Sequence, residues 1–74
     1  MVEAHVKFGG YLYVIEANWI PLLRNKYNYV ARILKVLERT SGKDVTVSVG
    51  ESYGVTPGEA IDKVFKAACT ILGE

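Results

Sequence analysis

The glycine pair Gly9-Gly10, set between two alternating runs of residues, constrains the fold more than any other feature of the sequence. Residues 2–8 alternate between apolar and polar side chains, which predicts a half-buried strand, and residues 11–17 predict its return strand. Because a two-residue turn fixes the register, Phe8 should lie opposite Tyr11. The apolar and aromatic side chains of both strands then share one face, and we expect this face to point into the core.

Two helices and a third strand are predicted after this hairpin. Pro21 suits the first turn of a helix, and apolar residues at helical spacing predict that this helix runs to residue 39 or 40. Residues 44–49 (DVTVSV) predict a strand, and a capping-box pattern over residues 56–59 predicts a second helix over Pro57–Leu72. The predicted fold is a two-layer α/β sandwich of the order β-β-α-β-α, with a three-stranded mixed sheet and both helices on one face.

Length and composition limit the class of protein. A chain of 74 residues forms one domain over 1–74, and its 50% hydrophobic content excludes disorder. The lone Cys69 excludes a disulfide or a cysteine-based zinc framework and is typical of a reducing compartment. No apolar stretch approaches the ~18 residues of a membrane span. We therefore expect a cytoplasmic protein without cofactor or metal, and the absence of Gln is typical of a thermophilic source.

Basic residues are concentrated in the first predicted helix, which holds five of the nine Lys and Arg residues and a single acid. At ~100° per residue, four of these cations fall on one side of the helix, with the amides of Asn25 and Asn28 among them. The candidates for nucleic-acid contact are Arg24, Asn28, Arg32, Lys35 and Arg39. Cations with no acid among them suit phosphates, because each neutralised phosphate releases condensed counterions. An ordinary solvated helix face is the alternative interpretation.

Aromatic side chains are the second functional signal. The three rings of the predicted hairpin lie on its apolar face, so they are predicted to be core or interface residues. The better candidate for stacking on exposed bases is Tyr53, in a loop bounded by Gly50 and Gly54. Trp19, at a strand–helix junction, is the second candidate, and packing at one end of the core is the alternative interpretation for its ring.

Catalysis is not expected from this sequence. Glu3 and Glu16 face each other on the open side of the predicted hairpin, and His5 lies beside Glu3. Paired carboxylates serve as acid and base only where a pocket or a nucleophile accompanies them, and the pattern supplies neither. We predict that the protein is not an enzyme.

The first predicted helix has a wider apolar surface than a small sheet can cover. The surplus side is a candidate oligomer interface, and its residues are Leu22, Tyr29, Ile33 and Val36. The predicted strand over 44–49 contains no Pro and leaves an edge that invites pairing with another subunit. We therefore expect a homodimer or a higher homo-oligomer. A protein-interaction or assembly module that uses these two surfaces is the alternative function.

Three runs, NYVARILKVL at 28–37, DVTVSVG at 44–50 and EAIDKVFKAA at 59–68, resemble the helix–strand–helix part of the Alba family of archaeal nucleic-acid-binding proteins. The small size, the composition and the aromatic content are also similar to short relatives of the single-stranded-DNA-binding protein of Thermoproteales. Both resemblances imply nucleic acid as the partner. Together with the charge pattern they predict binding without sequence preference. Single-stranded DNA or RNA is favoured over duplex, because the net charge is only +1 and aromatic residues are plentiful.

Overall fold

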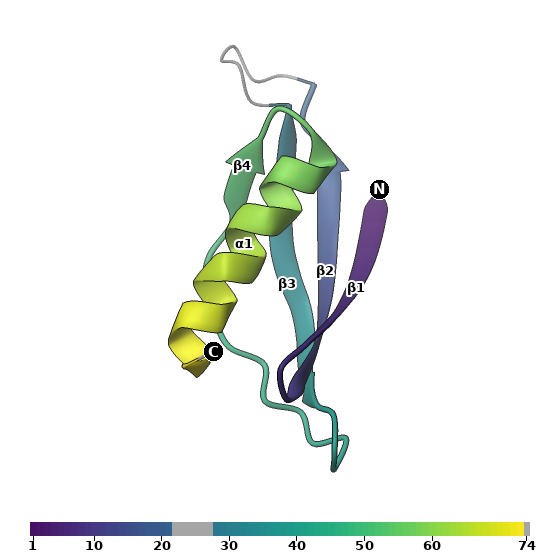
Figure 1. Cartoon of the computed structure of the whole chain (residues 1–74). Helices are drawn as coiled ribbons and strands as arrows, with labels where there is room; N and C mark the ends of the chain where they lie inside the picture. The colour runs from purple at the N-terminus through teal and green to yellow at the C-terminus, as the bar shows by residue number, and fades with distance from the viewer. Residues whose placement is uncertain (22–27, 74) are drawn as a thin grey trace.

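The computed structural model describes residues 1–21 and 28–73, and over these residues it contains four strands and one helix (Figure 1). The elements are β1 (Val2–Phe8), β2 (Tyr11–Trp19), β3 (Tyr29–Glu38), β4 (Ser52–Gly54) and α1 (Pro57–Leu72). The strands form one antiparallel sheet in the order β1-β2-β3-β4, and α1 lies across one of its faces (Figure 1). The fold is therefore α+β, but the predicted three-stranded mixed sheet with two helices is wrong.

The β1–β2 hairpin confirms the prediction made from its alternation and its glycine pair. Phe8 pairs with Tyr11 and Val6 pairs with Tyr13, so the register is the predicted one. Gly9 has a φ of 58°, a conformation that glycine adopts at little cost in a two-residue hairpin turn. Tyr13 belongs to the apolar face of the hairpin, and its side chain is fully buried under α1.

The first predicted helix is wrong, because residues 29–38 form β3 instead. A β-bulge in β3 explains why its sequence resembles that of a helix. Val14 pairs with Lys35 while Ile15 pairs with Ile33, so Leu34 is an extra residue on β3. The bulge changes the phase of the strand, and the side chains that face the core are those of 31, 33 and 36. This mixture of two- and three-residue steps imitates the apolar spacing of a helix.

The predicted strand over 44–49 is also wrong, although the segment does run beside β3. It begins like a strand, with the N–H of Val45 donating to the carbonyl of Val36 (2.8 Å). The backbone N–H of Val36, however, donates to the side-chain hydroxyl of Thr46 (3.0 Å) and not to a backbone carbonyl of this segment. Because a side-chain hydroxyl takes the place of a backbone carbonyl, the ladder of backbone hydrogen bonds between this segment and β3 ends here. Val47 and Val49 still pack against the core, and the strand that pairs with β3 on the side away from β2 is β4.

The second predicted helix is confirmed as α1. The Thr56 hydroxyl accepts from the N–H of Glu59 (3.1 Å), Pro57 occupies the first turn, and Gly73 ends the helix with a φ of 77°. The buried side of α1 includes Val64 and Cys69, and the Cys69 thiol donates to the Tyr13 hydroxyl (3.6 Å). This contact ties the helix to the centre of β2.

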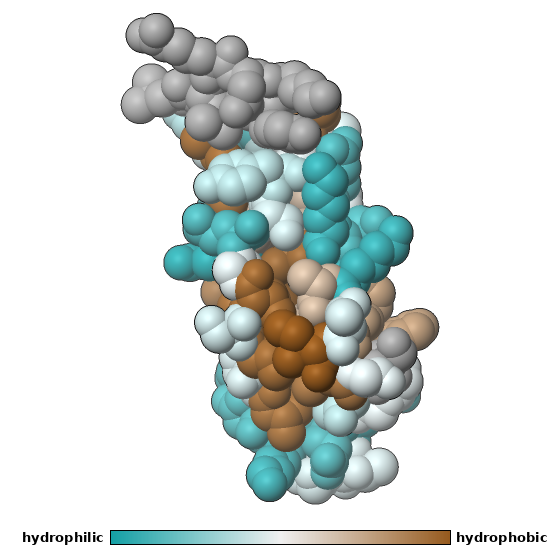
Figure 2. All heavy atoms as spheres, turned by 90° about the vertical axis from the view of Figure 1, so that its left-hand side faces the viewer, coloured by the Kyte–Doolittle hydropathy of each residue, from teal (hydrophilic) through white to brown (hydrophobic). Residues whose placement is uncertain are grey.

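The core lies between α1 and the sheet, and hydrophobic residues also reach the surface on one side of the molecule. Figure 2 looks onto the side that carries β4 and α1, where hydrophobic residues gather in a patch with hydrophilic residues around it. β1 belongs to the opposite side and extends beyond the helix (Figure 1). Within the described residues, no helix has the length and the apolar character that crossing a membrane requires.

Candidate nucleic-acid interface

The sheet has one face under α1 and one face that no described element covers, which we call the open face. The register and the alternation of side chains assign residues from every strand to it. Its residues are Glu3, His5 and Lys7 of β1, Leu12, Val14, Glu16 and Asn18 of β2, Val30, Arg32, Lys35 and Leu37 of β3, and Tyr53 of β4.

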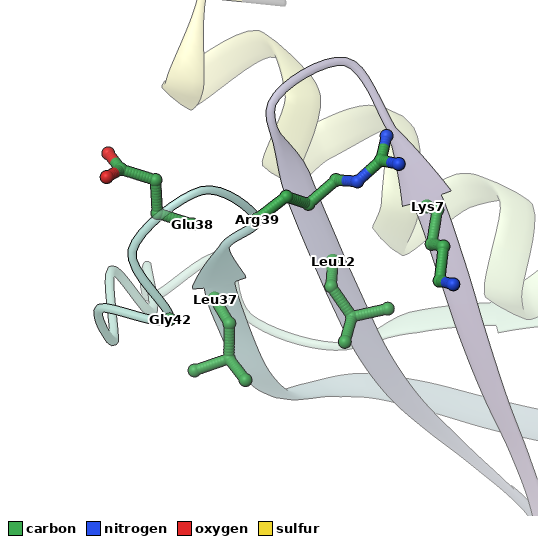
Figure 3. A pocket seen from close by; sticks show the side chains of 6 residues that line it. All are labelled: Lys7, Leu12, Leu37, Glu38, Arg39 and Gly42. Atoms are coloured by element: carbon green, nitrogen blue, oxygen red, sulfur yellow. The ribbon is translucent and has the colours of Figure 1, made fainter.

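One end of the open face is basic, and we call it the basic end. It consists of Lys7, Leu12, Leu37, Lys35 and Arg39. Lys7, Leu12 and Leu37 lie side by side across three strands, and their side chains point to the same side of the sheet (Figure 3). Together with Glu38, Arg39 and Gly42 they line a shallow hollow. The floor of the hollow is apolar, and its rim carries two cations and one carboxylate.

Two hydrogen bonds fix the position of Arg39 just beyond the end of β3. Its N–H donates to the carbonyl of Gly10 (2.8 Å), and its guanidinium donates to the carbonyl of Gly9 (3.1 Å). The side chain therefore runs from β3 across the hairpin toward Lys7, whereas the side chain of Glu38, which also lines the hollow, extends away from these two cations (Figure 3). Because one guanidinium nitrogen is used for the turn, the remaining donors of Arg39 stay available at an exposed position.

The middle of the open face is acidic and screens one of its cations. Glu3 lies opposite Glu16, which lies opposite Arg32. A guanidinium nitrogen of Arg32 is 3.4 Å from a carboxylate oxygen of Glu16, and the amide of Asn18 donates to the same oxygen. The carboxylate of Glu16 therefore offsets part of the positive charge of Arg32, whereas Lys35 makes no such ion pair within the described residues. On the β1 side of this row, the two carboxylates would repel an anion.

The structure brings together some of the predicted contact residues and separates others. Arg32 and Lys35 share the open face because the bulge gives them a three-residue spacing, and Arg39 follows them at the basic end. Asn28 is exposed, but its backbone connects two elements: its N–H donates to Gly54 (3.0 Å) and its carbonyl accepts from the N–H of Ile20 (2.8 Å). Arg24 lies outside the described residues.

The two predicted stacking residues lie on opposite faces of the sheet. Tyr53 pairs with Val30, belongs to the open face and is 41% exposed. It is a strand residue, not the loop residue that we expected. Trp19 is 64% exposed, and the alternation along β2 puts it on the same face as Ala17, which is the helix side. The two rings therefore do not form one platform.

Most of the predicted oligomer interface faces the core of the chain itself. Val36 is fully buried, and Tyr29 and Ile33 are partly buried against the core. Leu22 lies outside the described residues. This surface was predicted on a helix, but residues 29–38 form a strand. The assembly module that the sequence suggested as an alternative therefore lacks one of its two predicted surfaces. Its other surface, the edge at 44–49, is held against β3 by Val45 and Thr46.

Sequence reasoning missed Lys7 and the apolar floor of the basic end. The signal was present, because the correctly predicted hairpin register already places Lys7 opposite Leu12. What the sequence did not reveal was β3 as the third strand, which adds Leu37, Lys35 and Arg39 to this corner.

Two ionisable groups outside the basic end, His5 and Asp44, have partners in the structure. His5 Nε2 is 3.8 Å from a carboxylate oxygen of Glu3, on the exposed side of β1. Asp44 accepts from both the hydroxyl (2.5 Å) and the N–H (2.9 Å) of Thr46, and these two hydrogen bonds lower the pKa of its carboxyl group. Among residues 1–21 and 28–73 no group of three or more His, Cys, Asp or Glu side chains could hold a metal ion.

Comparisons with protein-family models, with curated proteins and with solved structures return no match. The helix that the Alba-like pattern implies for residues 28–37 is a strand from Tyr29 onward. The functional interpretation therefore depends on the chemistry of the open face.

Proposed function

We propose that the protein binds nucleic acid without sequence preference through the open face of its sheet, and that it acts as a binding protein rather than an enzyme. The observation that carries this proposal is the basic end, where Lys7 and Arg39 line a hollow with an apolar floor and Lys35 lies in the next row of the sheet. Cations arranged in this way would contact phosphates, and the floor would accept sugars and the edges of bases. We propose a cytoplasmic location, because the only cysteine, Cys69, is a free thiol.

Single strands of DNA or RNA are the ligand that this surface would favour. A strand leaving the basic end would follow β3 past Arg32 toward Tyr53, because the carboxylates of Glu3 and Glu16 repel phosphates on the β1 side. Stacking of a base on an exposed ring contributes about 1–3 kcal/mol and tolerates any sequence. A duplex presents about two charges per 3.4 Å of its axis, which a chain of net charge +1 would neutralise poorly.

Fluorescence anisotropy of labelled oligonucleotides, titrated at ~50 and ~200 mM salt, tests this proposal. Each phosphate neutralised on a single strand contributes about 0.7 to the slope of log affinity against log salt. If Lys7, Lys35 and Arg39 each contact one phosphate, affinity should fall about 20-fold over this fourfold change in salt. The double variant Lys35→Gln/Arg39→Gln should bind more weakly, and its affinity should fall only about threefold.

A charge-matched variant on the helix side provides the control. Lys66 is exposed on α1, where its ammonium group is 2.9 Å from a carboxylate oxygen of Asp62. Lys66→Gln removes the same charge as Lys35→Gln, but it should leave both the affinity and the salt slope at the wild-type values. Equal effects of the two substitutions would mean that net charge, and not the open face, governs binding. No binding at the lower salt concentration would refute the proposed function.

A further inference from the structure

The outer edge of β1 has the features of a strand that pairs with another strand. Within the described parts of the chain β1 has a neighbour on one side only, because the sheet order is β1-β2-β3-β4. Its seven residues contain no Pro or Gly, and its pairing with β2 is regular from Val2 to Phe8. A regular edge of this length is the form that natural proteins usually protect from pairing.

The hairpin turn determines which backbone groups of β1 point outward. In a two-residue turn the carbonyl of Phe8 and the N–H of Tyr11 close the turn, so Phe8 directs its backbone groups toward β2. Because direction alternates along an antiparallel strand, Glu3, His5 and Lys7 direct their N–H and C=O groups away from β2. These three residues offer three donors and three acceptors to a second strand.

The side chains of β1 are complementary to a second copy of β1 in one antiparallel register. If each residue i pairs with residue 10 − i of the other copy, Glu3 lies opposite Lys7, and His5 lies opposite His5 on the two-fold axis. Glu3, His5 and Lys7 all belong to the open face, so the acid and the base meet on the same side of the sheet. Opposite charges in directly facing positions stabilise strand pairing.

The helix side of β1 is complementary in the same register. Val2 would face Phe8 and Ala4 would face Val6, so a small side chain meets a larger one in each pair. These residues are incompletely covered: Phe8 is 48% and Val2 42% exposed, although Phe8 also packs edge to face on Phe65 of α1. Figure 1 shows why, since β1 extends past the side of the helix. Pairing with a second copy would cover this apolar strip.

Other registers lose this match. If the second strand moved by one residue, backbone N–H and C=O groups that point toward the partner would lie opposite groups that point away from it. The apolar side chains of one copy would also turn to the open face. The next permitted registers place His5 opposite Glu3 or opposite Lys7, and then Phe8 or Val2 extends past the end of the partner strand. The 10 − i register alone pairs all seven residues of β1 and sets each acid against a base.

We infer that the chain forms a two-fold homodimer through β1–β1 pairing in the 10 − i register, which joins two sheets into one eight-stranded antiparallel sheet. The two helices then lie on the same side, and the two open faces form one continuous surface. This inference does not rest on the proposed function, because it uses the edge of β1 and not the ligand chemistry. An interface of one strand pair is small, so the association should be weak.

Sedimentation velocity of the full chain, from about 10 μM to about 1 mM, tests the inference, since a weak dimer forms by mass action over such a range. The wild type should pass from monomer to dimer. Glu3→Lys and Lys7→Glu each set like charges opposite one another twice per dimer, so each should raise the dissociation constant at least about tenfold. An equimolar mixture of the two variants restores both attractive pairs and should form a heterodimer.

Two further variants separate pairing from folding. His5→Pro removes an outward N–H and no bond to β2, so it should keep the far-ultraviolet circular dichroism of the wild type while remaining monomeric. Lys66→Glu makes the same charge change as Lys7→Glu on the far side of α1, and it should dimerise like the wild type. A wild type that stays monomeric over the whole range, or charge variants that self-associate as well as the wild type does, would overturn the inference.

Discussion

Replacing Gly54 with alanine should destabilise the protein strongly, because β4 and the first turn of α1 touch at this residue. Gly54 is buried, and a Cβ added to it would lie 2.6 Å from the backbone nitrogen of Ala60 and 2.9 Å from Cβ of Glu59. Ordinary contacts to a Cβ fall at 3.4–4 Å. Backbone atoms cannot rotate out of the way, so β4 and α1 would have to move apart by about 1 Å, against the close packing of the interior.

The cost of this separation sets the size of the effect. Forcing extra volume into a packed interior typically costs about 1–3 kcal/mol, and the contact to backbone atoms places Gly54→Ala toward the upper end. For a domain of this size 1 kcal/mol corresponds to roughly 4–8 °C in the melting temperature. We therefore expect differential scanning calorimetry or thermal circular dichroism to show a melting temperature about 10–20 °C below that of the wild type.

A second glycine provides the matched control. A Cβ at Gly10 has no atom within 4 Å, and Gly10 is not among the glycines with positive φ. Gly10→Ala should therefore melt at the wild-type temperature or slightly above it, since alanine restricts the unfolded chain. If Gly54→Ala and Gly10→Ala melt together, the close packing of β4 on α1 is refuted, and with it the placement of Tyr53 on the open face.

Three further predictions concern the segment beside β3 and the ring of Tyr53. Thr46→Val removes the acceptor of the buried Val36 N–H and should cost about 1–3 kcal/mol in urea unfolding, whereas Thr46→Ser, which keeps the hydroxyl, should cost much less. The hydrogen bonds from Thr46 lower the pKa of Asp44 below its ordinary value of 3.8, so this carboxylate stabilises the fold above that value. The contribution should disappear as the pH falls through the lowered folded-state pKa, and Asp44→Asn should remove this part of the pH dependence of unfolding; an unchanged profile would contradict it. Tyr53→Ala should weaken binding of single-stranded oligonucleotides in the anisotropy assay by about 1–3 kcal/mol, while Tyr53→Phe should retain the affinity; equal losses would exclude stacking.

Local signals in the sequence predict the two ends of the chain correctly. The hairpin follows from strict alternation around a glycine pair, and α1 follows from Thr56 at its cap and Gly73 at its end. Each of these features acts within a few residues, so the local sequence is enough to determine the hairpin and the bounds of α1. The middle of the chain differs, because its structure depends on pairing between β2 and β3, and such pairing joins residues that do not share a local sequence pattern.

β3 shows why the middle could not be predicted from periodicity. A bulge at Leu34 arises only when β3 pairs with β2, and it converts a two-residue period into one that resembles a helix. Thr46 is a similar case, since a threonine in an alternating run is typical of a strand, yet its hydroxyl takes a backbone role in the ladder. Both errors come from contacts that a local pattern does not contain.

The candidate site was predicted in part, for a reason that proved to be wrong. Arg32, Lys35 and Arg39 were selected because they share a side of a helix, whereas they gather at one side of the sheet because of the bulge. The three-residue spacing that suggested a helix is the same spacing that puts Arg32 and Lys35 on the open face. Lys7 completes the basic end only through the tertiary position of β3 beside β2.

The most direct test of the central claim is an NMR titration that follows the lysine side chains while a single-stranded oligonucleotide is added. Lys7 and Lys35 belong to the open face, whereas Lys63 and Lys66 lie on α1, paired with Glu59 (3.3 Å) and Asp62 (2.9 Å). We predict that the side-chain methylene signals of Lys7 and Lys35 shift with the oligonucleotide concentration and that those of Lys63 and Lys66 stay in place. Shifts confined to the two helix lysines, or of equal size at all four, would contradict an interface on the open face.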